Sequence, residues 1–330
     1  MRITRQLEDL AIEPRPIVLA VGSFDGVHRG HQRVIERAVA EAAAANAESW
    51  VLTFDPHPLK VLMPRAAPPL ITANAHKLQL IEPLGVSGCV LMPFTREVAR
   101  IEPAAFIERL QAAVPELRGM VVGSNWTFGH RARGNVELLS DLAPRHGFGV
   151  TRVEPVLWKG EPISSTRVRQ AVSAGRLAEA EEMLGRPFSV FGTVVRGRNI
   201  GRQLGFPTAN LDPHNEVRPP SGVYAARVTV RGRAHGGAAF VAETADAQST
   251  PSGFVIEAYI LDFEGSLYGE DIEIGFLRRL REVRRFASMP ALREQIGRDV
   301  EAIREQLGLR APERLAAEAE EWDESLDSRR

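Results

Sequence analysis

The sequence predicts an α/β domain with a parallel sheet, followed by a small antiparallel β-barrel and a C-terminal helix. In the first half, apolar runs of strand length alternate with helical segments, which favours a parallel sheet covered by helices. From residue 188 to 275 the pattern changes to short β-prone runs separated by turn residues. Closely spaced strands without intervening helices are typical of an antiparallel barrel.

The elements of the first half follow from apolar runs and their boundaries. The run at 16–23 is short, apolar and closed by glycine, and 31–46 is rich in Ala, Glu and Arg without Gly or Pro, which predicts a buried strand and then a helix. Further strands are expected at 49–54, 86–92 and 119–123, with an extended segment at 148–157. Further helices are expected at 75–83, 103–112, 135–146 and 166–184.

In the second half, strands are expected at Phe188–Val195, Gly222–Val230, Phe254–Phe263 and Asp271–Phe276. A helix at 290–307 carries apolar residues near helical spacing. The charged stretch 311–330 is expected to be a solvated helix or a frayed tail. The predicted domains are therefore 1–185, 186–310 and the tail 311–330.

Composition narrows the class of partner. Of the 330 residues, 44% are hydrophobic and 25% charged, as in ordinary globular proteins, and the net charge of -1 offers no basic field for nucleic acid. The first residues do not resemble a signal peptide, so we expect none; the sequence has no apolar run of membrane-span length and a single cysteine, Cys89. These features predict a cytoplasmic protein that binds small molecules rather than nucleic acid or membrane.

The segment 22–31 joins the first predicted strand to the first predicted helix. Gly22 and Gly30 allow close backbone approach, and the helix start presents free N–H groups to a phosphate. His28 and His31 can donate hydrogen bonds to a phosphoryl group and to the charge that develops on it. The plainer alternative is a strand–helix turn with two surface histidines.

This segment resembles the His-x-Gly-His signature of the nucleotidyltransferase superfamily, in the form found in bacterial bifunctional riboflavin kinase/FMN adenylyltransferases. Three more segments match that family in the same order, namely Thr53–Pro58, Gly123–Gly129 followed by Arg131 and Gly134, and Ile163–Arg169. The similarity continues to about residue 305. The resemblance implies a Rossmann-like nucleotidyltransferase domain that joins AMP from ATP to FMN. It also implies a barrel of the riboflavin kinase type.

The resemblance assigns roles in the first domain. His28 and His31 would be catalytic, and the flavin would contact Asp55, Pro56 and Asn125. In the second domain, Arg281 would be a flavin-binding residue. Hydroxyls at 164–166 begin a helix, where they can cap it and bind phosphate. The ATP-binding residues would be Gly22, Phe24, Asp25, Gly30, Ser164, Thr166 and Arg167. Taken alone, the hydroxyls and arginines could be an ordinary helix cap, and Asn125 and Trp126 could be packing residues.

A second site is expected in the barrel. Thr208 and Asn210 lie two apart, so on an extended chain they face the same way, and two such oxygens can help to hold Mg²⁺. The run around them resembles the Pro-Thr-Ala-Asn signature of riboflavin kinases, which implies nucleotide binding by Gly201, Arg202, Gly205 and Pro207. Glu257 matches the family's general base. The alternatives are a Gly/Pro-rich barrel turn and an exposed strand carboxylate.

The predicted function is FAD biosynthesis, with ATP, riboflavin, FMN and FAD as substrates or products and Mg²⁺ as cofactor. The stretch 236–251 lacks the Asn and the Pro-Thr pair of a loop in relatives, and Ser266 replaces a usual Asp. An FMN adenylyltransferase with a weak or inactive kinase domain is therefore one alternative. A non-catalytic, flavin-binding regulatory protein is another. The sequence leaves the oligomeric state open, including a homo-oligomer.

Overall fold

The computed structural model describes residues 1–11, 15–197, 200–243 and 253–309. The described chain divides into two compact units. The first comprises 1–170 and 179–186, and the second comprises 171–178 together with the described residues from Pro187 onward. The predicted domains 1–185 and 186–310 differ from these units, because they placed 171–178 in the first domain and Arg186 in the second.

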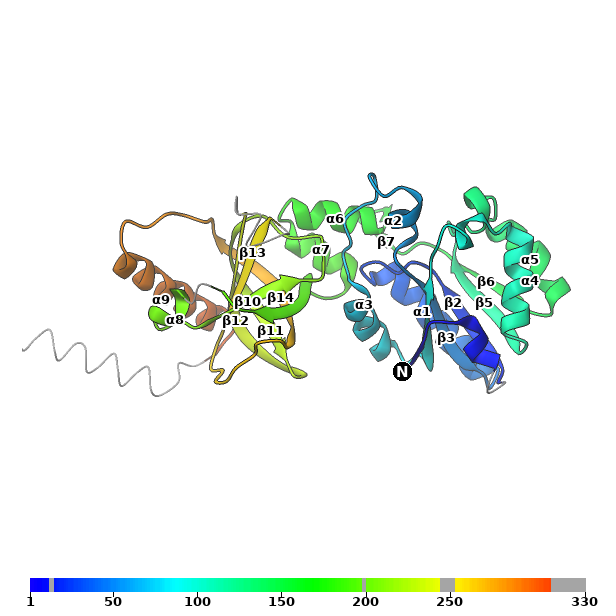
Figure 1. Cartoon of the computed structure of the whole chain (residues 1–330), viewed down its shortest axis with the longest axis horizontal. Coiled ribbons are helices and arrows are strands. Elements are labelled where there is room, and N and C mark those ends of the chain that lie inside the picture. The colour runs from blue at the N-terminus through cyan, green and yellow to red at the C-terminus, as the bar shows by residue number, and fades with distance from the viewer. Residues whose placement is uncertain (12–14, 198–199, 244–252, 310–330) are drawn as a thin grey trace, which may run out of the picture. The chain divides into compact units, whose positions relative to one another are not determined.

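The first unit is built on a parallel six-stranded sheet in the order β1-β4-β3-β2-β5-β6 (Figure 1). Its strands are β1 (Arg2–Thr4), β2 (Ile17–Val21), β3 (Glu48–Asp55), β4 (Gly88–Pro93), β5 (Leu117–Gly123) and β6 (Gly149–Val153). β2 lies in the middle, and all five of its residues are buried. Such a continuous apolar run is what a strand covered on both faces requires.

Helices cover both faces of this sheet. They are α1 (Arg29–Ala44), α3 (Asn74–Ile81), α4 (Pro103–Ala113) and α5 (Val136–Leu142), while the short helix α2 (Pro58–Leu62) has no buried residue. One core packs α4, α5 and the 3₁₀ turn Leu7–Ala11 against one set of strand residues, including Leu19. The other packs α1 and α3 against the alternate set, including Ala20. The period-two alternation of strand side chains thus divides one apolar run between two cores.

The second unit contains a closed barrel in the order β10-β13-β12-β11-β14-β9. Its strands, all paired antiparallel, are β9 (Ser189–Val195), β10 (Thr208–Pro213), β11 (Gly222–Val230), β12 (Arg233–Glu243), β13 (Phe254–Ile260) and β14 (Asp271–Arg281). α8 (Ile200–Gln203) precedes β10, and α9 (Met289–Gln306) buries Val300 and Ile303 in a core with Ala225 and Leu261. The predicted fold class is confirmed.

Several predicted elements were wrong in detail. The single helix at 166–184 is two helices, α6 (Ser165–Ser173) and α7 (Leu177–Leu184), separated at Gly175, whose φ of 73° ends a right-handed helix. The strands β1, β10 and β12 were not predicted. β12 includes a run of glycine and alanine with low strand propensity, so only pairing with β11 and β13 makes it a strand.

Other boundaries also moved. Residues 143–146 of the predicted helix 135–146 form a separate 3₁₀ turn that contains Pro144. The extended stretch 148–157 is strand only at β6, and it is followed by the hairpin β7 (Leu157–Trp158) and β8 (Glu161–Pro162). β13 ends three residues earlier than predicted, and β14 runs on to Arg281. The predicted tail 311–330 lies outside the described residues.

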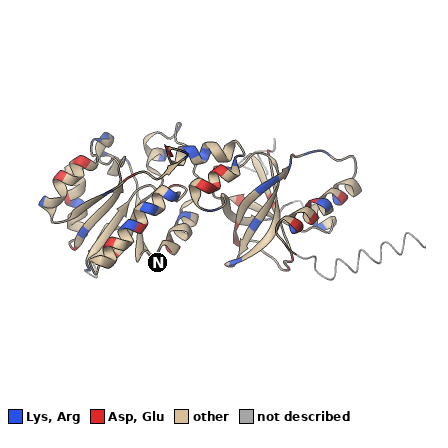
Figure 2. Cartoon of the chain, turned by 180° about the vertical axis from the view of Figure 1, so that it is seen from behind, with Lys and Arg blue, Asp and Glu red and all other residues tan. Residues whose placement is uncertain are grey.

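Charges are mixed on the helices. Figure 2 shows Lys and Arg interleaved with Asp and Glu along α1 and α9. This agrees with a net charge near zero and with the absence of a basic field in the sequence. None of the described helices combines the length and apolar character that a membrane span needs.

Candidate active sites

The turn between β2 and α1 is strained and tightly held. Phe24 and Val27 have φ angles of 48° and 41°, a region that side chains, and β-branched ones above all, rarely adopt. The Val27 carbonyl accepts hydrogen bonds from Gln32 at 2.8 Å and from Arg186 at 3.2 Å, and Arg186 also donates to the Gly26 carbonyl. Such strain persists only where its surroundings over-determine the backbone, as they do here.

His28 and His31 lie face to face at the start of α1. Their ring centroids are 3.5 Å apart, and the planes differ by 19°. Nδ1 of His28 accepts the backbone N–H of His31 and so caps the helix, which leaves the ring proton on Nε2. Gly30 makes the arrangement possible, because a Cβ there would come within 3.1 Å of the His28 ring. Within the described structure, Nδ1 of His31 is buried and has no hydrogen-bond partner.

Both imidazoles are neutral at pH 7. The pKa of His28 is lowered to about 4, mainly by burial and in addition by the charges of Arg186 and Arg169, although a backbone hydrogen bond opposes the shift. Burial also holds the pKa of His31 well below its ordinary value, with added effects of His28 and Lys77. The pair is therefore able to offer hydrogen bonds but no positive charge at pH 7.

Acid is expected to destabilise the first unit through His28. A folded-state pKa below the ordinary 6.5 means that the unfolded chain binds the proton more tightly, so stability is lost as pH falls from 6.5 toward 4. One such group contributes about 1.4 kcal/mol per pH unit in that window. Urea unfolding followed by tryptophan fluorescence should show a shallower pH dependence for His28→Asn than for the wild type. If stability depends on pH equally in both proteins, the acid sensitivity does not come from His28.

The start of α6 meets this turn, as the phosphate-site prediction required. The Ser165 hydroxyl donates to the Asp25 carbonyl at 2.9 Å, and Arg169 forms an ion pair with the Asp25 carboxylate at 2.5 Å. Ser164 caps α6 by accepting the Arg167 N–H at 3.3 Å. Two segments about 140 residues apart in the sequence therefore form one site.

Asp25 is 1% exposed, and its carboxylate also accepts the backbone N–H groups of Ile71 and Thr72. These bonds and the Arg169 pair occupy both of its oxygens, so in this structure Asp25 orders the turn. Phe24 is similarly occupied, because its buried ring makes an edge contact with His31 at 5.4 Å. Gly22 is held by its N–H bond to the Leu52 carbonyl.

The side chains of two other predicted ATP-binding residues, Arg167 and Thr166, make no hydrogen bond to the turn between β2 and α1 within the described residues. The Arg167 guanidinium donates to the carbonyls of Glu161 and Pro162, each at 2.8 Å, and it lies over the ring of Trp158. Its charge is thereby held against the β7–β8 hairpin. Thr166 is exposed at the first turn of α6.

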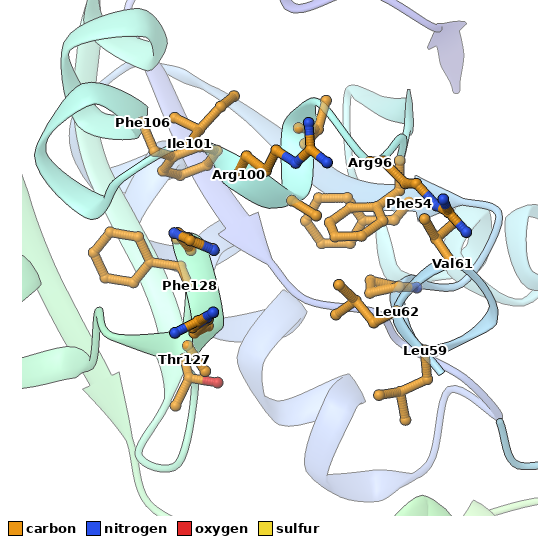
Figure 3. Close-up of a pocket in the computed structure, with 18 of the residues that line it drawn as sticks. Phe54, Leu59, Val61, Leu62, Arg96, Arg100, Ile101, Phe106, Thr127 and Phe128 are labelled. Carbon is orange, nitrogen blue, oxygen red and sulfur yellow. The ribbon is translucent and has the colours of Figure 1, made fainter. Parts of the chain in front are cut away.

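The first unit also contains a cavity of about 580 Å³, lined by residues between 54 and 132. Figure 3 shows side chains from 54–62, 96–106 and 127–128 around it, with phenylalanines prominent among them. Trp126, which also lines the cavity, stacks on Phe128 with centroids 4.7 Å apart. A cavity of this size, walled by aromatic rings and rimmed by Arg96 and Arg100, is suited to a flat, planar ligand.

The predicted flavin residues of this domain flank the cavity without lining it. Asn125 and Pro56 are exposed, and Asp55 pairs with Arg5 at 3.3 Å. Their chain neighbours, Phe54 and Trp126, supply the walls. Trp126 is therefore both a packing residue and a cavity residue.

The barrel gathers its predicted kinase residues. The Thr208 hydroxyl donates to the Glu257 carboxylate at 3.1 Å, and Asn210 is the register partner of Glu257 on the neighbouring strand. A Cβ on Gly197 would lie 2.3 Å from the Asn210 side chain, so glycine leaves room for that amide. Arg202, Pro207 and Thr208 line a cavity of about 510 Å³. Gly201 lies in α8, and Gly205 is exposed with a φ of 85°.

Arg281, which was predicted to bind flavin, is paired with an aspartate of α9. Its guanidinium donates to both oxygens of Asp299 in α9, at 2.7 to 3.0 Å, and Asp299 is 7% exposed. Gln295 donates to the same carboxylate. The pair ties α9 to the last barrel strand, which gives Arg281 a structural role in this structure.

Replacing Arg281 with methionine is expected to lower stability and leave the riboflavin KM unchanged. Breaking a buried ion pair costs several kcal/mol, and the partial exposure of this pair reduces the loss to about 2 to 3 kcal/mol. Calorimetric unfolding and riboflavin kinetics measure the two effects. Asp299→Asn is the matched control and should cause a similar loss of stability. A raised riboflavin KM in the arginine variant alone would restore Arg281 to the flavin site.

Sequence reasoning missed several residues at these sites. Phe94 and Phe106 line the cavity, and Arg186 holds the segment 22–31 between β2 and the start of α1, which we call the histidine turn. None of these three residues belongs to the motifs used. Phe54 lies inside a motif and shows a usable signal, since it directly precedes the Asp-Pro-His-Pro stop. Lys77 is buried beside the histidines and carries no sequence signal beyond the scarcity of lysine in this chain.

Family models agree with this division of chemistry. The FAD synthetase model matches residues 11–167, and the riboflavin kinase model matches residues 184–307. A bifunctional riboflavin kinase/FMN adenylyltransferase of Escherichia coli K12 is 34% identical over 94% of this chain and all of its own length. A protein of the same description from Listeria monocytogenes is 35% identical over 87% of this chain and 91% of its own.

A solved structure shares the fold. The crystal structure described as a macrolide-efflux protein from Streptococcus pneumoniae superposes with a TM-score of 0.77 and 29% identity. The match covers 92% of this chain and 98% of that one. With both family models and full-length relatives above 30% identity, the chain belongs to the bifunctional riboflavin kinase/FMN adenylyltransferase family.

Proposed function

We propose that the first unit joins AMP from ATP to FMN and so makes FAD. The observation that carries this proposal is the meeting of the histidine turn with the start of α6, through Ser165 and Arg169 on Asp25. A phosphate oxygen of FMN attacks the α-phosphorus of ATP, the bond from that phosphorus to the bridging oxygen breaks, and pyrophosphate leaves. The attacking phosphate is already ionised, so no general base is needed.

The protein contributes positioning and hydrogen bonds. Nε2–H of His28 is free of its cap bond and can donate to the phosphoryl oxygens, and His31 lies stacked beside it. Neutral donors in a buried site stabilise the developing charge without reorganising at the moment of reaction. The aromatic cavity, with Phe54 and Trp126 in its wall, is proposed to hold the isoalloxazine ring.

The barrel is proposed to phosphorylate riboflavin. Glu257 is placed to take the proton of the ribityl hydroxyl as that oxygen attacks the γ-phosphorus of ATP, with ADP as the leaving group. The Thr208 hydroxyl orients the carboxylate, and the cavity lined by Arg202 and Pro207 is proposed to take the nucleotide.

The oxygen set of Thr208, Asn210 and Glu257 fits Mg²⁺, which prefers hard oxygen ligands. Thr208 and Asn210 would hold the ion, which when bound offsets the charge of the phosphates. No cluster of three or more His, Cys, Asp or Glu side chains that could hold a metal occurs in the described parts of the chain. The proposed ion therefore depends on the hydroxyl and the amide.

The stretch 236–251, which departs from the relatives, affects whether the kinase is expected to be active. The sequence predicted an altered loop there, but its first part, to Glu243, belongs to the paired strand β12. Its remainder, from residue 244, lies outside the described residues. Since β12 pairs in register with the strand that carries Glu257, we propose that the kinase turns over. We also propose that both reactions take place in the cytoplasm.

Chromatography of flavins tests both activities. Purified protein with riboflavin, ATP and Mg²⁺ is expected to form FMN and then FAD, with pyrophosphate release. FAD from supplied FMN, but none from riboflavin, would mean that the kinase is silent. Flavin binding without pyrophosphate release would instead show a non-catalytic, flavin-binding protein.

A further inference from the structure

Lys77 is buried beneath the histidine turn. The chain has three lysines, and Lys77, in the middle of α3, is 3% exposed. Lys159 lies on the β7–β8 hairpin with its side chain 66% exposed. An ammonium group is almost never fully buried without a counter-ion, so its partners need an explanation.

The Lys77 ammonium has one hydrogen bond among the described residues. Nζ donates to the Thr53 hydroxyl at 3.3 Å, and that hydroxyl donates to the Ser23 carbonyl in the histidine turn at 3.1 Å. No carboxylate in the described part of the chain lies within ion-pair distance of Nζ. Two of the three ammonium protons therefore have no acceptor among the residues that the structure describes.

Nearby charges do not neutralise Lys77. Asp25 and Asp55 raise its pKa, as does Cys89, but burial outweighs them and lowers the pKa below its ordinary value. Asp25 is paired with Arg169, and Asp55 with Arg5. The ammonium in turn lowers the pKa of His31 and of His57, so its charge acts on the histidine turn and on the cap of α2.

We propose that Lys77 is a phosphate-binding residue of the adenylyl-transfer site, and that a phosphate oxygen of ATP supplies its missing counter-ion. A buried cation without an anion destabilises a fold. The presence of Lys77 beside the neutral imidazoles of His28 and His31 therefore indicates that an anion arrives with the substrate. As pyrophosphate leaves the α-phosphorus, the ammonium would offset charge that the neutral imidazoles cannot. This inference rests on the proposed adenylyl transfer.

Nuclear magnetic resonance of lysine tests binding directly. Full-length protein labelled with ¹³C at lysine Cε has three side-chain signals, and the one missing from Lys77→Met belongs to Lys77. Saturating pyrophosphate is expected to raise the apparent pKa of that signal and leave the Lys159 signal in place. An unmoved Lys77 signal, with pyrophosphate binding shown by a thermal shift, would overturn the inference.

Kinetic measurements distinguish phosphate binding by Lys77 from a purely structural role of its hydrogen bond to Thr53. Lys77→Met is expected to lower kcat/KM for ATP in FAD formation about 100-fold, as loss of one transition-state donor does. Because methionine removes an unpaired buried charge, the ligand-free protein should be no less stable than the wild type. Lys159→Met is the matched control and should leave FAD formation unchanged. If Lys77 only stabilises the fold through Thr53, Lys77→Met would lower stability and leave kcat/KM unchanged, which would contradict the inference.

Two failures can be told apart. If the wild type forms no FAD from FMN and ATP, the proposed adenylyl transfer itself fails. If the wild type forms FAD and Lys77→Met does so equally well, only the role of Lys77 fails. Riboflavin phosphorylation, in the other unit, should be unchanged in all three proteins.

Discussion

Replacing His31 with alanine is expected to lower the rate of FAD formation from FMN by about 10²- to 10³-fold, the usual cost of one preorganised donor. The imidazole is neutral and stacked on His28, so its loss removes a hydrogen-bonding group and not a structural charge. The cap of α1 survives, because His28 accepts the backbone N–H of residue 31 and not its side chain.

The measurement is single-turnover conversion of FMN to FAD, beside FMN formation from riboflavin in the same preparation. Phosphorylation of riboflavin should be nearly unchanged, because its residues lie in the second unit. His146→Ala, at the end of a 3₁₀ turn, is a control for histidine loss and should match the wild type. Equal loss of both reactions in the His31 variant would refute two independent sites.

Replacing Glu257 with glutamine is expected to lower riboflavin phosphorylation by about 10²- to 10⁴-fold, which is the usual contribution of a positioned general base. Glutamine keeps the size and an oxygen that can accept the Thr208 hydroxyl, but it cannot take a proton from the ribityl oxygen. FAD formation from supplied FMN should proceed at the wild-type rate.

Initial rates of FMN formation measure this effect. Glu301→Gln, on an exposed position of α9, makes the same chemical change away from the cavity and serves as the control. If the Glu257 variant keeps full kinase activity, another group must act as the base.

Much of the fold could be predicted because its signals are local. The apolar run before Gly22 predicts the buried central strand β2, and the alternation that follows predicts the parallel sheet. Where the local signal is weak, prediction failed. β12 reads as a glycine and alanine stretch, yet β11 and β13 pair with it along its length. Backbone hydrogen bonds to neighbours decided that element, and propensity did not.

The chemistry of the sites divides in the same way. The sequence by itself indicated the segments that we propose hold reactive groups, since His28, His31 and Thr208 fall within short motifs, while Glu257 was identified through the resemblance to the family. Only the tertiary structure decided which charges are already paired. Asp25 pairs with a residue 144 positions away, Arg281 pairs with Asp299, and Lys77 lacks a carboxylate partner among the described residues. Pairing depends on distances and burial that arise only when distant segments pack together, and no local pattern of residues encodes them.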